Sequence, residues 1–289
     1  MNKILYKKQL SDNVYQIRIE APHIAEEREP GQFIILSVND EFGERIPLTI
    51  ADADTNEGSI TLIFQAVGKT TMLLSELNEG DYIENLLGPL GNPTEIKKVG
   101  HIVCVGGGIG VAPLYPIAEA MKKAGNRLTV IIGARSKDLV IMEEEMKKIA
   151  DKLIVCTDDG SYGRKDLVTI PLKEICETDK PDEAVIIGPP IMMKFCVETT
   201  RPYKVPSVVS LNSIMIDGTG MCGGCRVTVG GETKFVCVDG PEFDGHKVDF
   251  ENLVNRLNSF KEQETWAKGH ACRLDKAVLQ GKKDPGKNE

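Results

Sequence analysis

Three cysteines and one aspartate lie close together in the C-terminal third of this 289-residue chain. Their spacing is D-x4-C-x2-C-x11-C, with Asp217 first, followed by Cys222, Cys225 and Cys237. A plant-type [2Fe–2S] cluster needs four anionic ligands, three of them in the spacing C-x4-C-x2-C, with glycines that let backbone amides approach the sulfur atoms. A carboxylate is a harder ligand than a thiolate, but it can serve a ferric ion. We therefore predict that these four residues hold a [2Fe–2S] cluster.

Two other interpretations of this segment remain open. The three cysteines, together with His246 or an acid, also suit a structural zinc ion. Asp217 precedes a glycine, and an Asp-Gly pair is a common turn former, so its carboxylate has a purely structural alternative. No other nearby cysteine can take its place, because Cys196 lies far upstream and Cys272 far downstream.

Three glycine-containing loops follow apolar segments in the middle of the chain. They are GGGIGVAP at residues 106–113, TDDGSYG at 157–163 and GPP at 188–190. Glycines permit a tight turn from strand to helix and close approach of a pyrophosphate to the helix N-terminus. The first loop departs from G-x-G-x-x-G, and alone it is equally well a bare turn. The three loops together indicate a dinucleotide site at the carboxyl ends of parallel strands.

Two acids in the second loop bear on the choice of dinucleotide. Asp158 and Asp159 can hydrogen-bond ribose hydroxyls and would repel a 2′-phosphate. If they lie at that ribose, they favour NAD over NADP. The alternative is that both acids are simply solvated.

The N-terminal third contains two shorter motifs that suit a flavin. RIPLT at residues 45–49 closes an expected strand, and GKTT at 68–71 opens an expected helix. Arg45 and the glycine-threonine helix start can jointly hold a flavin pyrophosphate, while Thr49 can reach the isoalloxazine ring.

The pattern of predicted strands and helices that must position these motifs changes along the chain. Residues 1–97 contain short β-branched runs, at 14–19, 32–38 and 59–66, separated by turn residues, which predicts a small antiparallel barrel. From residue 98 to 211, apolar strands alternate with helical stretches, which predicts an open parallel α/β domain like the Rossmann fold. The predicted parts that follow are a cluster-binding loop region, 212–249, and a C-terminal helix and tail, 250–289. The strands expected in the α/β domain cover 101–105, 128–132, 153–156 and 184–187.

One face of the C-terminal helix is apolar, and simple packing explains it. The residues at helical spacing are Phe250, Leu253, Val254, Leu257 and Phe260. Residues 281–289 have the composition of a solvated tail.

Composition excludes several classes of protein. The formal net charge of −8 opposes nonspecific binding to nucleic acid. The first 20 residues interrupt their apolar positions with charges, and we expect neither a signal peptide nor a membrane span. We therefore expect a cytoplasmic protein, in which the eight cysteines serve as metal ligands or free thiols rather than disulfides. His101 and His270 are expected to be structural, because no catalytic triad is supported around them.

Taken in order, RIPLT, GKTT, GGGIGVAP, TDDGSYG and the cluster loop resemble the ferredoxin–NADP reductase superfamily. Within it, the chain resembles the small (alpha) subunits of NADH-dependent reduced ferredoxin:NADP oxidoreductases, and is similar to the electron-transfer subunits of dihydroorotate dehydrogenases. The resemblance covers roughly residues 1–265. Asp217 and the segment VDGPEFDGH at 238–246 resemble the first group, because the dihydroorotate-linked subunits generally have cysteine at position 217.

The resemblance implies FAD on the barrel, NAD(H) on the α/β domain and a [2Fe–2S] cluster near a partner. Hydride would pass between NAD(H) and flavin, and single electrons between flavin and cluster. By position, the FAD-binding residues would be Arg45, Pro47, Leu48, Thr49, Gly68, Lys69, Thr70 and Thr71, with Thr49 the candidate catalytic residue. The NAD site would be lined by Gly108, Ile109, Gly110, Asp158, Asp159 and Gly188. One departure is Ile187, which replaces the cysteine of a Cys-Gly-Pro sequence found in many relatives and puts a thiol contact to the nicotinamide in doubt.

The resemblance also implies a heterodimer. A large subunit would carry NADP(H), a second, bifurcating FAD and [4Fe–4S] clusters, and ferredoxin would be reached only through it. Two alternatives are retained. One is a subunit for another NAD-linked partner, such as dihydroorotate dehydrogenase, sulfide dehydrogenase or a glutamate synthase-like flavoprotein. The other is a non-catalytic flavin and iron–sulfur carrier or redox sensor.

Overall fold

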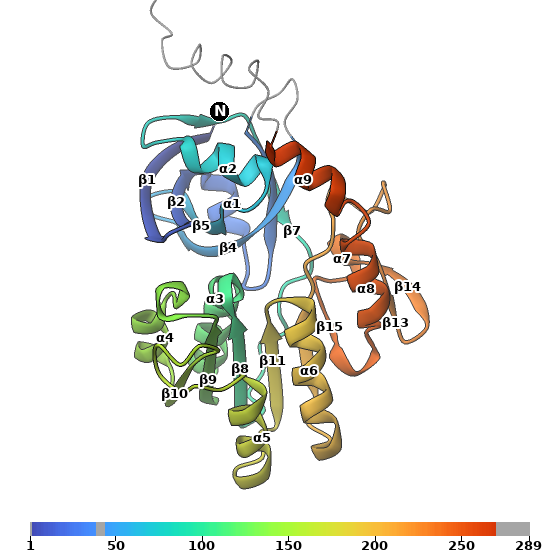
Figure 1. Cartoon of the computed structure of the whole chain (residues 1–289). Helices are drawn as coiled ribbons and strands as arrows, with labels where there is room; N and C mark the ends of the chain where they lie inside the picture. The colour runs from blue at the N-terminus through green and yellow to red at the C-terminus, as the bar shows by residue number, and fades with distance from the viewer. Residues whose placement is uncertain (1, 39–43, 270–289) are drawn as a thin grey trace, which may run out of the picture.

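The N-terminal part of the chain folds as an antiparallel barrel (Figure 1). The computed structural model describes residues 2–38 and 44–269. Seven strands pair in the order β6-β1-β2-β5-β4-β3-β7. They are β1 (Asn2–Ser11), β2 (Val14–Glu20), β3 (Phe33–Ser37), β4 (Ile46–Asp54), β5 (Ser59–Gln65), β6 (Tyr82–Ile83) and β7 (Asn85–Leu90). Two helices accompany the barrel, α1 (Pro22–Glu27) and α2 (Lys69–Glu76).

Buried apolar residues along the barrel strands form its core. In β2, Val14, Ile17 and Ile19 are buried, and β2 pairs in antiparallel register with β5. All five residues of β3 are buried, and β-branched residues pack well on a pleated sheet, which explains why the expected runs at 14–19, 32–38 and 59–66 are strands. The predicted barrel is confirmed.

The central part is an open sheet with the strand order β10-β9-β8-β11-β12-β15. Its first five strands are parallel, and β15 pairs antiparallel with β12. All residues of β8 are buried, as expected for a strand covered on both faces. The strands are β8 (His101–Gly107), β9 (Arg127–Ala134), β10 (Lys152–Thr157), β11 (Glu183–Ile187), β12 (Ser207–Ser210) and β15 (Glu242–Asp244).

Helices lie on both faces of this sheet (Figure 1). They are α3 (Val111–Lys123), α4 (Glu143–Ile149), α5 (Thr169–Thr178) and α6 (Pro190–Thr200), with the short 3-10 turns η1 (Gly108–Gly110), η2 (Lys137–Leu139) and η3 (Arg201–Tyr203). The predicted Rossmann-like domain is confirmed. Strand β15 was not predicted from the sequence, and it joins the region after residue 211 to the edge of this sheet.

The C-terminal part contains a hairpin, two short turns and two helices. These are β13 (Arg226–Val229), β14 (Glu232–Phe235), α7 (Val236–Asp239), η4 (Gly245–Lys247), α8 (Phe250–Leu257) and α9 (Lys261–Gly269). Phe250 and Leu253 of α8 are buried, as the apolar face predicts. Phe260 is 55% exposed, because α8 ends at Leu257 and α9 starts in a new direction toward α2 (Figure 1). The expected tail, with His270 and Cys272, lies outside the described residues.

Within the described ranges, no helix is both long and apolar enough to cross a membrane.

Candidate functional site

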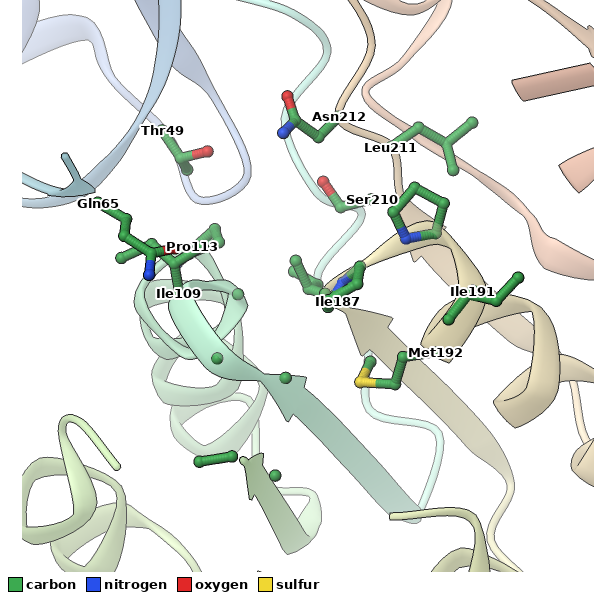
Figure 2. A pocket seen from close by; sticks show the side chains of 18 of the residues that line it. Thr49, Gln65, Ile109, Pro113, Ile187, Ile191, Met192, Ser210, Leu211 and Asn212 are labelled. Atoms are coloured by element: carbon green, nitrogen blue, oxygen red, sulfur yellow. The ribbon is translucent and has the colours of Figure 1, made fainter. Parts of the chain in front are cut away.

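A cleft of about 1230 Å³ lies between the barrel and the parallel sheet. Figure 2 shows that its side chains come from both parts, with Thr49 and Gln65 from the barrel and Ile187, Met192 and Ser210 from the α/β domain. Of the residues expected to bind cofactors, the cleft brings together Pro47, Leu48, Thr49, Thr71, Gly108, Ile109, Gly110, Asp158 and Gly188. Arg45, Gly68, Lys69, Thr70 and Asp159 do not line it.

The barrel wall of the cleft ends at the N-terminus of α2. The Thr71 hydroxyl accepts hydrogen bonds from the backbone amides of Val67, at 3.1 Å, and Gly68, at 2.9 Å. It donates to the carbonyl of Gly68 at 3.0 Å. The Thr70 hydroxyl donates to the Glu44 carboxylate at 3.2 Å. Thr71 thus caps the start of the helix, and a helix N-terminus favours an anionic group.

The opposite wall is formed by two glycine turns that pack on each other. A Cβ on Gly110 would lie 2.5 Å from the carbonyl oxygen of Ile187 and 2.8 Å from the Cα of Gly188. Gly108 has φ +54° and no atom within 4 Å of its Cβ position, so it faces open space. The Met192 thioether fills the place where side chains on Gly107 or Gly188 would lie. Such a cradle without Cβ atoms fits the close approach of a dinucleotide.

The structure separates the two acids of the 157–163 loop. Asp158 is exposed and lines the cleft. The Asp159 carboxylate instead accepts hydrogen bonds from the backbone amide and the hydroxyl of Ser161, at 2.9 and 2.7 Å. These bonds lower the pKa of Asp159, with the Ser161 hydroxyl as the largest cause. Of the two acids, Asp158 therefore lines the cleft, while Asp159 closes a turn.

Several cleft residues were missed by sequence reasoning. Arg135 follows β9 directly, next to the Asp158 loop, and Gln65 ends β5. Ser210, Leu211 and Asn212 lie where β12 ends (Figure 2). For Arg135, Ser210, Leu211 and Asn212, the signal that could have found them is their position at the carboxyl end of a parallel strand. Strand β12 has only four residues and was not recognised, and Gln65 ends an antiparallel strand, to which this signal does not apply.

Two of the predicted metal ligands lie side by side. The sulfur atoms of Cys225 and Cys237 are 3.2 Å apart and both residues are buried. Tetrahedral ligation with metal–sulfur bonds of about 2.3 Å separates two ligand sulfurs by about 3.7 Å, so this pair fits one metal ion after a small adjustment. Burial, reinforced by Cys225, raises the pKa of the Cys237 thiol to about 12. A bound cation reverses this effect because it favours the thiolate.

The other two ligand candidates lie in the exposed arm of the loop. The Asp217 carboxylate accepts hydrogen bonds from the backbone amides of Thr219, at 3.0 Å, and Cys222, at 2.8 Å. These bonds, with the Thr219 amide as the largest cause, lower the pKa of Asp217. Cys222 is exposed, and its sulfur accepts from the Gly224 amide at 3.4 Å. The Asp217 carboxylate and the Cys222 sulfur, each already hydrogen-bonded by backbone amides, form a donor set suited to iron.

The loop also contacts the barrel. The Arg45 guanidinium donates to the carbonyl oxygen of Asp217 at 3.4 Å. Arg45 does not line the cleft, and its guanidinium contacts the predicted cluster loop instead.

Within residues 2–38 and 44–269, no three His, Cys, Asp or Glu side chains converge closely enough to hold a single metal ion. The ring Nε2 of His246 lies 2.9 Å from the carbonyl oxygen of Val205, so this histidine is engaged elsewhere and the zinc interpretation is left with an acid as its fourth ligand.

Two stretches match known protein families. Residues 212–249 match the family described as the iron-sulfur cluster binding domain of dihydroorotate dehydrogenase B. Residues 104–198 match the oxidoreductase NAD-binding domain. The first match supports a [2Fe–2S] cluster over zinc.

Whole-chain relatives and solved structures agree. The chain is 50% identical, over 91% of its length and 93% of the relative, to a Thermotoga maritima protein named dihydroorotate dehydrogenase B (NAD(+)), electron transfer subunit homolog. It is 32% identical, over 86% and 97%, to the corresponding electron transfer subunit of Desulforamulus reducens. A solved structure of the NADH-dependent reduced ferredoxin-NADP oxidoreductase superposes with a TM-score of 0.89 at 48% identity, covering 93% of this chain and 97% of that one.

More distant structures share the fold alone. The ferredoxin reductase of carbazole 1,9a-dioxygenase, at 17% identity over 71% of this chain and 65% of that one, has a TM-score of 0.61. The cofactor set expected from the sequence, FAD, NAD(H) and a [2Fe–2S] cluster, is confirmed by these domains and this fold. The chain belongs to the family of dihydroorotate dehydrogenase B electron transfer subunits and their homologues, which are oxidoreductase subunits built on a ferredoxin-reductase-like fold.

Proposed function

We propose that this chain is the NAD(H)-binding small subunit of an electron-bifurcating, NADH-dependent ferredoxin:NADP oxidoreductase. The observation that carries the proposal is Asp217, which occupies the first ligand position of the D-x4-C-x2-C-x11-C loop and presents an ionised carboxylate there. The similarity to the solved NADH-dependent reduced ferredoxin-NADP oxidoreductase, at 48% identity over nearly the whole chain, supports it.

The two walls of the cleft suit different cofactors. Thr71 and Thr49 on the barrel side suit FAD, while Gly108, Gly110 and Asp158 on the sheet side suit NAD(H). When bound, the flavin converts the hydride of NADH into single electrons for the cluster. The residues of the chain would hold the isoalloxazine and nicotinamide rings in one cleft, and the apolar lining of the cleft would exclude water from both rings.

The cluster loop supports an outlet toward a partner. Cys222 is exposed and Met221 is 88% exposed, so this side of the loop is accessible from outside the chain. We infer that electrons leave here to a large subunit that carries NADP(H), a second FAD and [4Fe–4S] clusters, and that ferredoxin is reached through that subunit. Among the described residues, none of the seven cysteines forms a disulfide, which supports a cytoplasmic location.

A second candidate is the electron-transfer role in dihydroorotate dehydrogenase. The 50% identity to the Thermotoga maritima protein of that name favours it. In that case Asp217 would be an unexplained variation at the first ligand position.

An anaerobic pull-down of the tagged protein from its native host, with mass spectrometry of stoichiometric partners, decides between the two. A large flavoprotein with several four-cysteine cluster motifs is the expected partner. A dihydroorotate dehydrogenase catalytic subunit would overturn the proposal. In the same preparation, rapid bleaching of the flavin by NADH would reject a sensor that does not use pyridine nucleotide.

A further inference from the structure

Arginine side chains from separate elements contact carbonyl oxygens of the cluster loop. Arg226, the first residue of β13, donates from Nη1 to the carbonyl of Gly223 at 3.1 Å. Arg256, in α8, donates from Nη2 to the carbonyl of Gly224 at 3.0 Å. Both carbonyls lie between Cys222 and Cys225, so two fixed cations meet the C-x2-C turn of the loop.

The contact made by Arg226 acts on a ligand sulfur through one peptide group. The carbonyl of Gly223 and the amide of Gly224 belong to the same peptide unit, and in a trans peptide they point in opposite directions. The amide of Gly224 donates to the Cys222 sulfur at 3.4 Å. A guanidinium on the carbonyl therefore fixes the plane of this peptide and strengthens its N–H as a donor to sulfur.

Arg256 reaches the next peptide from a docked helix. Its side chain is half-buried, and α8 is held in place by the buried residues Phe250 and Leu253. Burial, with the nearby charge of Arg226, lowers the pKa of Arg256, but a guanidinium stays charged in proteins. The charge of Arg256 is therefore screened less by solvent than that of the exposed Arg226.

These contacts have an electrostatic consequence for a cluster at this loop. With four anionic ligands the oxidised cluster is negative, and one-electron reduction makes it more negative. Adjacent cations and hydrogen bonds to the sulfurs both favour the reduced form, because they stabilise the added charge. We propose that Arg226 and Arg256 are positioning residues of the C-x2-C turn, whose contacts with the carbonyls of Gly223 and Gly224 raise the reduction potential of the [2Fe–2S] cluster. This inference rests on the cluster of the proposed function.

Dye-mediated reductive titration of the anaerobically purified, cofactor-loaded full-length protein, followed by electron paramagnetic resonance, tests the proposal. For Arg256→Gln we expect the equilibrium constant for one-electron reduction to fall about tenfold, which is a potential lower by about 59 mV. For Arg226→Gln we expect a fall of roughly threefold, together with altered g-values, because the peptide at Cys222 is released. Arg256→Lys keeps the charge and is expected to restore most of the potential.

A matched control exists in the same part of the fold. Arg201 donates to the carbonyl of His246 at 3.2 Å, but it precedes β12, whereas the cluster loop follows β12. Arg201→Gln removes the same charge and the same kind of contact, and its potential is expected to stay near that of the wild type. Unchanged potentials in Arg226→Gln and Arg256→Gln, or an equal shift in Arg201→Gln, would overturn the proposal.

The test remains decisive if one variant loses its cluster or if the proposed function fails. If Arg256→Gln does not retain its cluster, the reduction potential of Arg226→Gln, at the exposed arginine, tests the proposal. Because dithionite and dyes supply the electrons, the titration needs neither NADH nor the partner subunit. Failure of the proposed function, seen as a different partner or no NADH oxidation, therefore leaves these potentials measurable.

Discussion

The guanidinium of Arg45 and the backbone carbonyl of Asp217 are 3.4 Å apart, although 172 positions separate them in the sequence. Arg45 immediately precedes β4, which carries Thr49 into the cleft, and Asp217 opens the cluster loop. One side chain thus connects the barrel to the predicted metal site. Electron transfer between two carriers depends on their separation, so a fixed link of this kind suits a flavin that passes electrons to a cluster.

Replacement of Arg45 by glutamine is expected to lower FAD content several-fold while leaving most of the iron bound. The reason is that the RIPLT motif makes Arg45 the cation expected at the flavin pyrophosphate, although in this structure its guanidinium contacts the backbone carbonyl of Asp217 and does not line the cleft. Absorption spectroscopy for flavin and a colorimetric iron assay measure both quantities. Arg45→Lys is the control and retains more FAD. Full FAD retention in Arg45→Gln would contradict a role in flavin binding.

Alanine at Gly108 and at Gly110 should have different consequences. At Gly110 the new Cβ meets the backbone of Ile187 and Gly188, so the two turns must separate. We expect a KM for NADH more than tenfold higher and a lower Tm, because a clash with backbone atoms cannot be relieved by moving a side chain. At Gly108 the Cβ enters open space and costs about 1 kcal/mol for the left-handed backbone. Its main effect is expected on NADH binding.

Stopped-flow reduction of the flavin by NADH, with thermal unfolding of both variants, makes this comparison. Equal loss of Tm in the two variants would show that the packing of the turns does not differ as described.

The sequence was sufficient to predict the barrel, the parallel sheet and the cluster loop, because each is specified locally. Short β-branched runs, buried apolar strands and ligand spacing can be recognised without knowledge of tertiary contacts. Residues that depend on long-range pairing could not be predicted. Asn212 enters the cleft only because the short β12 pairs with β11 and then ends there, and β15 is fixed by pairing with β12 rather than by its own composition.

Dependence on tertiary contacts also explains why the side-chain directions of Arg45 and Asp159 were not predicted. Both match motifs by position, yet neither side chain lines the cleft. Arg45 turns to the carbonyl of Asp217, and the Asp159 carboxylate is held by Ser161. Local sequence gives residue type and approximate place, whereas the direction of a side chain is decided by partners far along the chain or within the same turn.

Glu242 should make stability depend on pH. Its carboxylate accepts a hydrogen bond from the Thr94 hydroxyl at 2.6 Å, between β15 and the end of the barrel region. Burial raises the pKa of Glu242, the negative charge of Glu183 adds to this, and the bond from Thr94 opposes it. A raised pKa means that the folded state binds more protons than the unfolded state. Stability is therefore highest below the unfolded value, about 4.3, and falls as pH rises through the folded pKa.

Glu242→Gln keeps the acceptor oxygen and removes the charge. At about pH 8 we expect a Tm higher than that of the wild type by about 2–4 °C, which corresponds to about 1 kcal/mol, and a smaller difference near pH 5. Scanning calorimetry at both pH values measures it. Burial also raises the pKa of Glu183, so Glu183→Gln serves as the neighbouring comparison. A difference that does not change with pH would mean that titration of Glu242 is not its cause.

Asp217 gives the most direct test of the ligand set. Asp217→Cys is expected to retain the cluster and to shift its reduction potential, because a thiolate replaces a carboxylate on one iron. Asp217→Ala is expected to lose more than half of the iron, because a ligand disappears and the amides of Thr219 and Cys222 lose their acceptor. Iron content and the potential, measured on anaerobic samples, separate the two effects. Asp217→Asn keeps an acceptor for the amides without the charge, so it distinguishes a turn former from a ligand. If Asp217→Asn keeps full iron content and Asp217→Cys keeps the wild-type potential, then Asp217 only shapes the loop, and the fourth ligand must be sought elsewhere.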